Sequence, residues 1–344
     1  MGTLLFLFIV PICYLLLRLT RSSRLPPGQR GYPVIGNILD IPATQQWKTF
    51  SEWTKIYGDV MCLKLPMHHV IVLGSPQAVS DLMEKRSDIY SDRPISIMDE
   101  LIGWDWAFAA MRYSLKWRAY RKAFHQHFNQ NEVHTFQPIQ LRECRAFLGR
   151  MLGSSESESL GQHIRQINTA IILKIAYDMD ITDVNDEYVR LAQEATLGFS
   201  MAHGLGATWV DLFPVLRHLP NWMPGMKFKK MADYYRSISW KMVHAPFGKV
   251  KQDINEEKAT SSLAHKLLER HQGTTKDGFD GEELARNVAA IAYAGAAHTV
   301  NKSSHSFIQY PSCRRNLICI GMGRPLKPNW DESSDKISSI AIAS

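Results

Sequence analysis

The chain opens with an apolar segment that is long enough to reach the range of membrane helices. Residues Thr3–Leu17 carry no charge, and Arg18, Arg21 and Arg24 follow directly. A membrane-spanning helix needs about 20 apolar residues and at least about 17, and cationic flanks stay on the cytoplasmic side. We therefore expect a transmembrane anchor at residues 1–20, with the body of the chain cytoplasmic. A cleaved signal peptide and a buried core helix are the alternatives, and the lack of a basic segment before the run disfavours the first.

A proline-rich hinge is predicted at residues 21–37. It contains the sequence Leu25-Pro26-Pro27-Gly28 and ends in Gly36-Asn37. Adjacent prolines fix φ and favour an extended path. The hinge is therefore expected to hold the body of the chain at a set angle to its anchor, and an ordinary linker is the alternative interpretation.

The polarity pattern of the body predicts a small sheet followed by many helices. Residues 47–57 have helical periodicity, and two short apolar runs, 60–65 and 70–73, predict a β-hairpin. Helical signals then continue from Ser75-Pro76 to Arg270, with interruptions at clusters of proline and glycine. The expected fold class is mainly α with a small N-terminal β-sheet, preceded by one transmembrane helix.

A helix with few charged residues is predicted over residues 284–300. Asp280 and Glu283 form a D-x-x-E capping pattern in front of it. A helix this poor in charge is typical of the interior of a large helical body. Its expected buried stripe consists of Leu284, Val288, Ile291 and Gly295.

Composition and charge narrow the class of protein. Hydrophobic residues make up 45% of the 344 residues and aromatic residues 10%, which excludes a largely disordered chain. The formal net charge of +7 favours an anionic partner such as a membrane surface, an acidic cofactor or an acidic redox protein. No zinc-finger or aromatic RNA-binding pattern accompanies the basic residues, so no nucleic acid is expected as a partner. The five cysteines are odd in number and widely spaced, which disfavours a disulfide framework and a zinc site.

Several segments occur in an order that resembles a known family. After the apolar segment and the hinge LPPGQRGYPVIGN come KIYGDVMCLKLPMHHVIVLGSPQAVSDLMEKRSDIYSDRP, WRAYR, LFPVLRHLPNWMPG and the helix that ends in AGAAHTV. This order resembles a microsomal cytochrome P-450 of the fungal type, which is a heme-thiolate monooxygenase. The resemblance covers Leu4–Val300. It implies a partial cytochrome P-450 domain at residues 38–308, followed by a divergent tail at residues 309–344.

The resemblance also implies a function, a cofactor and partners. A member of this family uses heme, dioxygen and electrons from an NADPH–cytochrome reductase to hydroxylate lipophilic small molecules, and the fungal type serves secondary metabolism. It further implies residence in the endoplasmic reticulum membrane through the anchor. The segments expected to line the substrate pocket, residues 99–104 and 199–209, are largely apolar or aromatic, which suits a lipophilic ligand.

Trp117 and Arg121 are four residues apart, so they share one face of the predicted helix. In the family that the chain resembles, a W-x-x-x-R pair at this place binds a heme propionate. The planar guanidinium group of arginine matches a carboxylate with two hydrogen bonds. The alternative is a surface arginine that stacks on a tryptophan.

The segment Ala294–Thr299 resembles the part of the family that activates oxygen. The resemblance gives Gly295 and Ala296 the role of small residues that admit dioxygen, and it gives Thr299 the role of the alcohol that assists oxygen activation. His298 stands where the family has an acid, which is a departure, although a neutral imidazole can also relay protons. The alternative is a polar spot on a core helix.

The cysteine loop of the family, F-x-x-G-x-R-x-C-x-G, has no convincing match. Cys319-Ile320-Gly321 matches only its end, and it follows Thr299 too soon to leave room for the intervening elements. Glu283–Arg286 spells the family's E-x-x-R but precedes the buried helix, so we interpret it as a coincidence. The axial cysteine of the iron is therefore expected to be absent. A truncated, catalytically inactive product and a membrane-anchored helical binding protein are the alternatives to an active enzyme.

Overall fold

The computed structural model describes residues 25–33, 35–42, 45–66, 69–153, 159–181, 183, 185–202, 209–258, 261–271, 273, 278–309 and 341–343. Side chains are described for these residues except 153, 159, 298–309 and 341–343. The chain divides into two compact units. The first lies within Met1–Asp92, Leu205–Pro214 and Pro328–Ser344, and the second lies within Arg93–Gly204 and Val215–Lys327.

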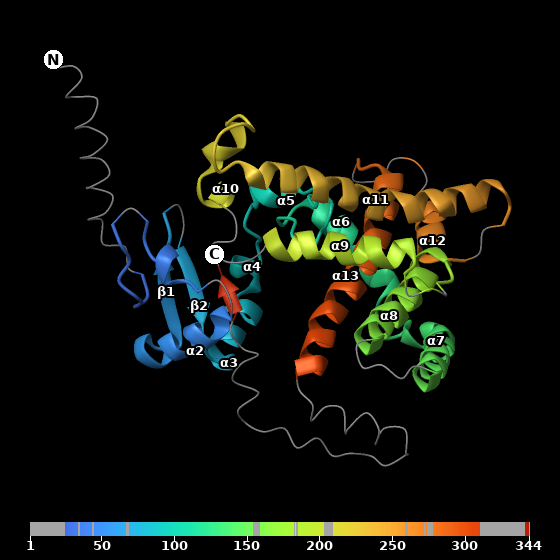
Figure 1. Cartoon of the computed structure of the whole chain (residues 1–344), viewed down its shortest axis with the longest axis horizontal. Coiled ribbons are helices and arrows are strands. Elements are labelled where there is room, and N and C mark those ends of the chain that lie inside the picture. Colours follow the sequence, from blue (N-terminus) through green and yellow to red (C-terminus); the bar gives the residue numbers. More distant parts are fainter. Residues whose placement is uncertain are drawn as a thin grey trace, which may run out of the picture. The chain divides into compact units, whose positions relative to one another are not determined.

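The first unit contains a small antiparallel sheet and short helices (Figure 1). Strand β1 (Val60–Lys64) pairs with β2 (His69–Leu73), and β3 (Ala341–Ala343) pairs with the other edge of β2. The helical elements are η1 (Ile38–Asp40), α2 (Gln46–Tyr57), α3 (Pro76–Val79), η2 (Ser80–Glu84), α4 (Ser87–Tyr90) and α10 (Trp209–Leu212). The predicted hairpin and the predicted helix before it are confirmed.

The core of this unit lies between the hairpin and α2. Met61 and Leu63 of β1 alternate along the strand, so they share one face of the sheet, and both are fully buried. Val72 of β2 and Phe50 of α2 pack into the same cluster. Cys62 belongs to the opposite face of β1 and is buried as well, which shows that both faces of this short strand are covered.

The hinge runs along the edge of β1 that does not pair with β2. The backbone N–H of Cys62 donates a hydrogen bond to the carbonyl oxygen of Pro27 over 2.9 Å. At the end of the hinge, Asn37 donates its backbone N–H to the carbonyl oxygen of Lys64 and accepts the Lys64 N–H at its own Oδ1. A Cβ at Gly28 would lie 1.9 Å from the carbonyl oxygen of Cys62. Residues 25–33 and 35–37 therefore contain backbone groups that pack along β1, and the role of the stretch as a hinge stays a prediction.

The second unit is a bundle of helices around α13 (Gly281–Gln309). Helix α13 packs against α6 (Leu115–His127), α8 (Ser159–Tyr177), α9 (Glu187–Ala202), α11 (Lys227–Asn255) and α12 (Leu263–Arg270). Helices α9 and α11 run side by side, and α13 crosses α9 (Figure 1). The other helical elements are α5 (Ile97–Leu101), α7 (Val133–Gly153) and η3 (Pro214–His218). A helix with neighbours on several sides must be apolar around most of its circumference, which explains the low charge of α13.

The expected buried stripe of α13 is buried only in its first half. Leu284 and Val288 are fully buried, whereas Ile291 is half-buried and Gly295 is exposed. The burial instead follows Tyr293, whose ring packs edge-on against Tyr177 of α8 with 6.2 Å between the ring centroids. The prediction for the second half of the stripe was wrong because Tyr293, two positions from both Ile291 and Gly295, packs the opposite side of the helix against α8.

The expected membrane anchor, Thr3–Leu17, lies outside the described residues, as do residues 310–340 of the expected tail. In the part of the chain that the structure describes, none of the helices combines the length and the hydropathy that crossing a membrane requires. The prediction of a mainly helical fold with a small antiparallel sheet is confirmed. The anchor and the domain boundaries stay predictions.

Candidate functional site

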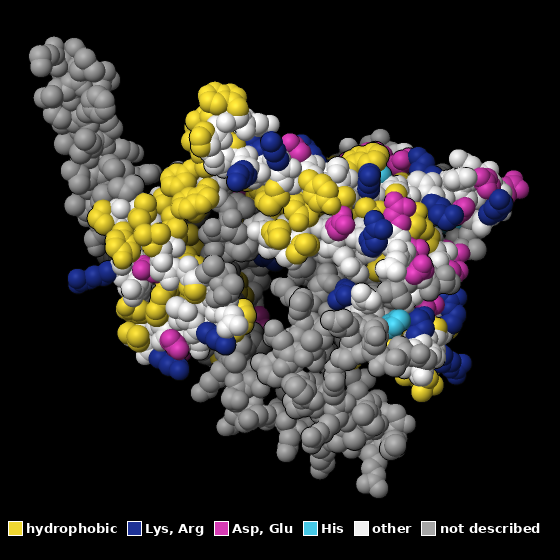
Figure 2. Space-filling model, viewed as in Figure 1, with side chains coloured by type: hydrophobic (Ala, Val, Ile, Leu, Met, Phe, Trp, Pro, Cys, Tyr) yellow, Lys and Arg dark blue, Asp and Glu magenta, His cyan; other side chains and the backbone are white. Residues whose placement is uncertain are grey.

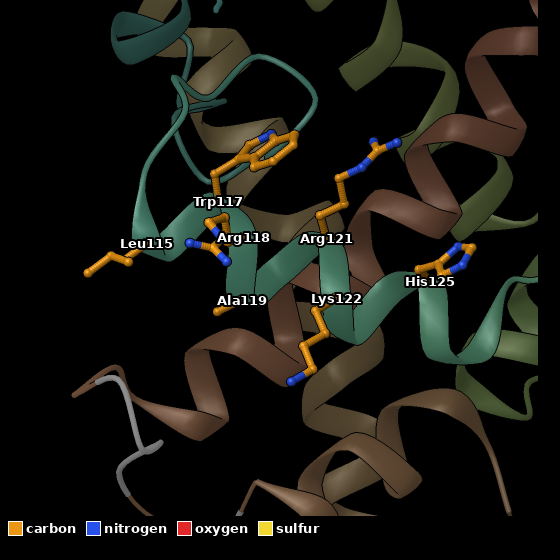
Figure 3. Close-up of a pocket in the computed structure, with 7 residues that line it drawn as sticks. All are labelled: Leu115, Trp117, Arg118, Ala119, Arg121, Lys122 and His125. Carbon is orange, nitrogen blue, oxygen red and sulfur yellow. The ribbon is translucent and has the colours of Figure 1, made fainter. Parts of the chain in front are cut away.

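The first turn of α6 positions the predicted W-x-x-x-R pair. Ser114 precedes the helix, and its Oγ accepts a hydrogen bond from the backbone N–H of Trp117 over 3.1 Å. A serine at this place satisfies an N–H that the helix leaves unpaired, and so favours a start at Leu115. Trp117 and Arg121 then lie one turn apart and project from the same side of α6 (Figure 3).

The two side chains of the pair contact each other. The guanidinium carbon of Arg121 lies 5.5 Å from the centre of the Trp117 ring, which is a cation–π distance. The ring of Tyr113 lies 5.2 Å from the same indole. Arg121 is exposed, and no carboxylate of the described residues pairs with it. This is the stacked arrangement that we gave as the alternative to propionate binding. The guanidinium group nevertheless stays exposed, so a ligand can reach it.

A hollow of about 670 Å³ surrounds this stretch of α6. Its lining holds basic side chains and no acidic one, so its electrostatic potential favours an anion. Figure 3 shows Lys122 projecting from the side of the helix opposite to Trp117 and Arg121. The lining residues are Leu115, Trp117, Arg118, Ala119, Arg121, Lys122 and His125.

A neighbouring face of α6 is fixed to α13 by polar side chains. Lys116 Nζ lies 2.9 Å from Glu283 Oε1, and Asn287 Nδ2 donates a hydrogen bond to the Tyr120 hydroxyl over 3.2 Å. Each helix contributes two residues that are four positions apart, so the two pairs lie one above the other. Burial, reinforced by the charge of Glu283, raises the pKa of Tyr120, and the phenol stays neutral.

The sequence did not predict these contacts between α6 and α13. The i,i+4 spacings Lys116/Tyr120 and Glu283/Asn287 were visible, but nothing in the sequence matched one pair to the other. The structure also explains Glu283, which belongs to the E-x-x-R tetrapeptide. Its carboxylate pairs with Lys116 and accepts a bond from Asn287. The interpretation of the tetrapeptide as a coincidence stays a prediction.

The C-terminal part of α13 offers an open surface at the predicted small residues. Gly295 is exposed, Ala296 is half-buried, and a Cβ at Gly295 would meet no atom within 4 Å. Thr299 lies one turn after Gly295, and His298 directly precedes Thr299. The side chains of His298 and Thr299 lie outside the described residues. Gly295 and Ala296 do not line the hollow around α6, so the structure leaves the predicted site in two separate parts.

A second hollow, of about 360 Å³, is lined by residues between Pro94 and Arg112. It includes Asp99 and Trp104, which the sequence placed near the substrate. The ring of Trp104 is buried and lies 4.4 Å from that of Phe199 on α9, so the two segments expected to line the pocket do meet. The lining is less apolar than expected, because Glu100, Asp105 and Arg112 also contribute to it.

The described residues fit the propionate of a heme group but do not supply a ligand for its iron. Arg121 over Trp117 offers a cation for the carboxylate of a propionate. The described cysteines are Cys62, which lies in the first unit where burial raises the pKa of its thiol, and Cys144, which is exposed on α7. Among the described residues, no group of three or more His, Cys, Asp or Glu side chains is arranged so that it could hold a metal ion. The axial thiolate that the family requires is therefore not supplied by the described part of the chain.

Comparison with known families gives a match over most of the chain. The model of the family named cytochrome P-450 matches residues 26–309. The matched range begins in the hinge, includes the pair on α6 and ends with the last residue of α13.

Fungal proteins are similar to the chain over nearly the same range. A cytochrome P-450 monooxygenase of Armillaria gallica is 38% identical over 291 residues, which cover 83% of this chain and 57% of that protein. Another, from Coprinopsis cinerea, is 36% identical over 84% of this chain and 56% of its own length. The tryptamine 4-monooxygenase of Psilocybe cyanescens is 31% identical over 95% of this chain and 66% of its own length. The chain thus spans little more than half the length of the first two relatives.

Proposed function

Because the chain belongs to the cytochrome P-450 family, we propose that it forms the helical part of a heme-dependent monooxygenase that hydroxylates lipophilic small molecules in fungal secondary metabolism. The observation that carries this proposal is the Trp117–Arg121 stack in a hollow whose charged lining is entirely basic. The match over residues 26–309 and the fungal monooxygenase relatives support it. The family match also excludes an unrelated helical adaptor.

In this proposal α6 binds the anionic edge of the cofactor. Heme bound with a cysteine thiolate supplies the iron centre at which dioxygen is activated. Arg121 donates its guanidinium N–H groups to a propionate carboxylate, and Trp117 donates its indole N–H while its ring holds Arg121 in place. The contacts of Lys116 and Tyr120 with α13 keep α6 in position for this binding.

On α13 we assign proton handling to Thr299 and His298, as the family resemblance implies. Thr299 holds a proton at its hydroxyl oxygen, and the imidazole of His298 takes up and returns a proton near neutral pH. Gly295 and Ala296 leave the adjoining surface open, and the exposure of Gly295 supports this role. Because His298 replaces an acid, replacing it with Asp should raise turnover in a loaded enzyme, and unchanged turnover would argue against a relay at this position.

The proposed partners follow from the same family. An NADPH–cytochrome reductase supplies electrons, and the formal net charge of +7 suits an acidic redox partner, with Lys and Arg side chains interspersed among acidic ones on the face that Figure 2 shows. We propose that Thr3–Leu17 anchors the chain in the endoplasmic reticulum membrane with the body in the cytoplasm. A variant that starts at Leu25 should then stay in the soluble fraction of a cell lysate. If it sediments with membranes as completely as the full chain, the anchor is assigned to the wrong segment.

We further propose that the 344-residue polypeptide by itself is inactive, because its sequence contains no complete cysteine loop. The test compares it with an extended chain, in which residues 310–344 are replaced by the C-terminal part of the Armillaria gallica relative. Reduced and exposed to carbon monoxide, the extended chain should show the Soret band of a thiolate-bound heme, and the 344-residue chain should not. Turnover by the 344-residue chain that Cys319→Ala abolishes would make Cys319 the ligand and overturn the proposed inactivity.

A further inference from the structure

Helix α7 covers one of its sides and leaves the opposite side open. It lies at the edge of the bundle, where it packs on α8 (Figure 1). Glu143 is buried and Phe147, one turn later, is half-buried, so these residues mark the side of α7 that meets its neighbour. In contrast, Leu141, Leu148 and Leu152 are 53%, 59% and 90% exposed.

The three exposed leucines form one stripe along α7. Leu148 and Leu152 follow Leu141 by seven and eleven positions, which are close to two and three whole turns of a helix. Glu143 is two positions from Leu141, which places it roughly half a turn away. The stripe therefore faces away from α8. Pro138 extends it by one more turn towards the start of the helix and is exposed as well.

Arg145 stands in the middle of this leucine stripe. It follows Leu141 by four positions and precedes Leu148 by three, and its side chain is exposed. Among the described residues, none of the carboxylates pairs with it. Arg142, on the flank of the stripe, is already paired with Glu143 at 2.8 Å. Because Glu143 is the acidic residue of α7 and is buried, the open side of this helix is apolar with an uncompensated positive charge at its centre.

This charge decides between the possible occupants of the stripe. A two-fold contact between copies of the chain brings the same face of each copy together. Arg145 is seven positions from both Pro138 and Leu152, so antiparallel stripes would place it against its own copy, and like charges repel. The stripe contains no Trp or Tyr, which are typical of surfaces that lie at a membrane interface. A carboxylate on a protein partner would instead form charge-assisted hydrogen bonds with Arg145.

We propose that the open side of α7 is a docking site for an acidic amphipathic helix of a partner protein. The apolar side chains of that helix cover the leucine stripe, and a carboxylate at the centre of its apolar face binds Arg145. The stripe from Pro138 to Leu152 is about 21 Å long, so the partner presents about four helical turns. The site lies on a different helix from the Trp117–Arg121 pair and requires no heme, so it goes beyond the proposed function.

Two synthetic peptides test this docking site on the full 344-residue chain. Both are amphipathic helices of equal length with leucines on one face, and the residue at the centre of that face is Glu in one peptide and Lys in the other. Fluorescence anisotropy of the labelled peptides should show that the Glu peptide binds about ten-fold more tightly, the equivalent of one hydrogen bond to a charged group. Arg145→Glu should reverse this preference.

A matched pair of leucine variants tests the apolar part of the site. Leu148→Ser should weaken binding of the Glu peptide by about ten-fold or more, because the peptide no longer buries this side chain. Leu197→Ser is the control, since Leu197 is similarly exposed but lies on α9, and it should bind the peptide like the wild type. The exposed thiol of Cys144 lies beside the stripe, so the Glu peptide should slow its alkylation in the wild type.

The proposal is overturned if both peptides bind alike, if Arg145→Glu keeps the wild-type preference, or if Cys144 reacts equally fast with and without the Glu peptide. A dimer of the chain that Leu148→Ser dissociates would show that a second copy occupies the stripe. Loss of peptide binding with anionic but not with neutral vesicles would show that lipid does. If the extended chain does not bind the Glu peptide, its C-terminal part covers the stripe, which also contradicts a partner protein.

None of these measurements depends on heme or on turnover. A failure of the docking site is therefore distinct from a failure of the proposed monooxygenase function.

Discussion

The hinge of the first unit and the pair on α6 of the second unit carry recognisable motifs for different physical reasons. In the hinge, Gly28 and Gly36 stand where a Cβ would lie 1.9 Å and 2.0 Å from carbonyl oxygens of β1. On α6, packing does not explain the identity of Arg121, which is exposed and rests on Trp117. A motif that close packing explains needs no ligand, whereas a motif that packing leaves unexplained points to one.

The same contrast occurs within α6 itself. Lys116 and Tyr120 face α13 and are paired with Glu283 and Asn287, so their role is structural. Trp117 and Arg121, each one position further along the helix, line the hollow instead. Substitutions at Lys116 and Tyr120 should therefore lower stability, whereas substitutions at Trp117 and Arg121 should weaken ligand binding with little change in stability.

The largest effect is expected at the hinge. Gly28→Ala places a methyl group against the carbonyl oxygen of Cys62, and neither backbone can move without breaking the bond from Cys62 to Pro27. Overpacking of this kind costs about 1–3 kcal/mol. Hydrogen exchange of the β1 and β2 amides should show the loss as weaker protection in the first unit.

Gly248→Ala is the matched control for this substitution. Gly248 lies inside α11, and a Cβ there would meet no atom within 4 Å. Alanine at such a helical position should stabilise α11 by about 0.5–1 kcal/mol. If Gly28→Ala is as harmless as Gly248→Ala, the hinge does not pack on β1 as described.

A smaller effect is expected where α6 meets α13. Tyr120→Phe removes the hydroxyl that accepts the bond from Asn287, in a fully buried position. We expect the free energy of unfolding of the second unit to fall by about 1 kcal/mol. Urea denaturation measures it, and Tyr234→Phe, which removes a hydroxyl that donates to Glu194 at an exposed position, should have a smaller effect. An unchanged midpoint in Tyr120→Phe would show that this bond contributes nothing to the stability of the second unit.

The smallest effect on stability is expected at Arg121. Its side chain is exposed, and its contact in the described structure is the stack on Trp117. Exposed contacts of this kind contribute about 0.5–1 kcal/mol at most. The free energy of unfolding of Arg121→Ala, measured in urea, should therefore be close to that of the wild type. A loss of stability larger than that of Tyr120→Phe would show that Arg121 has a structural role.

Local sequence patterns predicted most of the fold. The hairpin, the helix before it and the long helix α13 followed from alternation, periodicity and a capping residue, because these depend on neighbours in the sequence. The Asp280 cap is an example: its carboxylate accepts the backbone N–H of Glu282 over 3.0 Å. Glu283, the other residue of that pattern, pairs with Lys116 on α6 instead, which no local rule can foresee.

The sequence predicted how the paired residues lie on α6, but it did not predict how α6 and α13 contact each other. The spacing of Trp117 and Arg121 correctly placed both on one side of α6. The polar contacts of α6 with α13 remained hidden because they join residues more than 160 positions apart. The exposure of Gly295 was also missed, since it depends on Tyr293 packing against α8.

Heme affinity in the extended chain is the direct test of whether the pair on α6 binds a heme propionate. Arg121→Ala should weaken heme binding by about ten- to a hundred-fold, the equivalent of one hydrogen bond to a charged group. Lys122→Ala removes the same charge from the opposite side of the helix, in the same hollow, and should change the affinity by less than about two-fold. A propionate site at Trp117 and Arg121 predicts this difference between the two variants; equal heme affinity in Arg121→Ala and the wild type, or equal weakening by both substitutions, would contradict it.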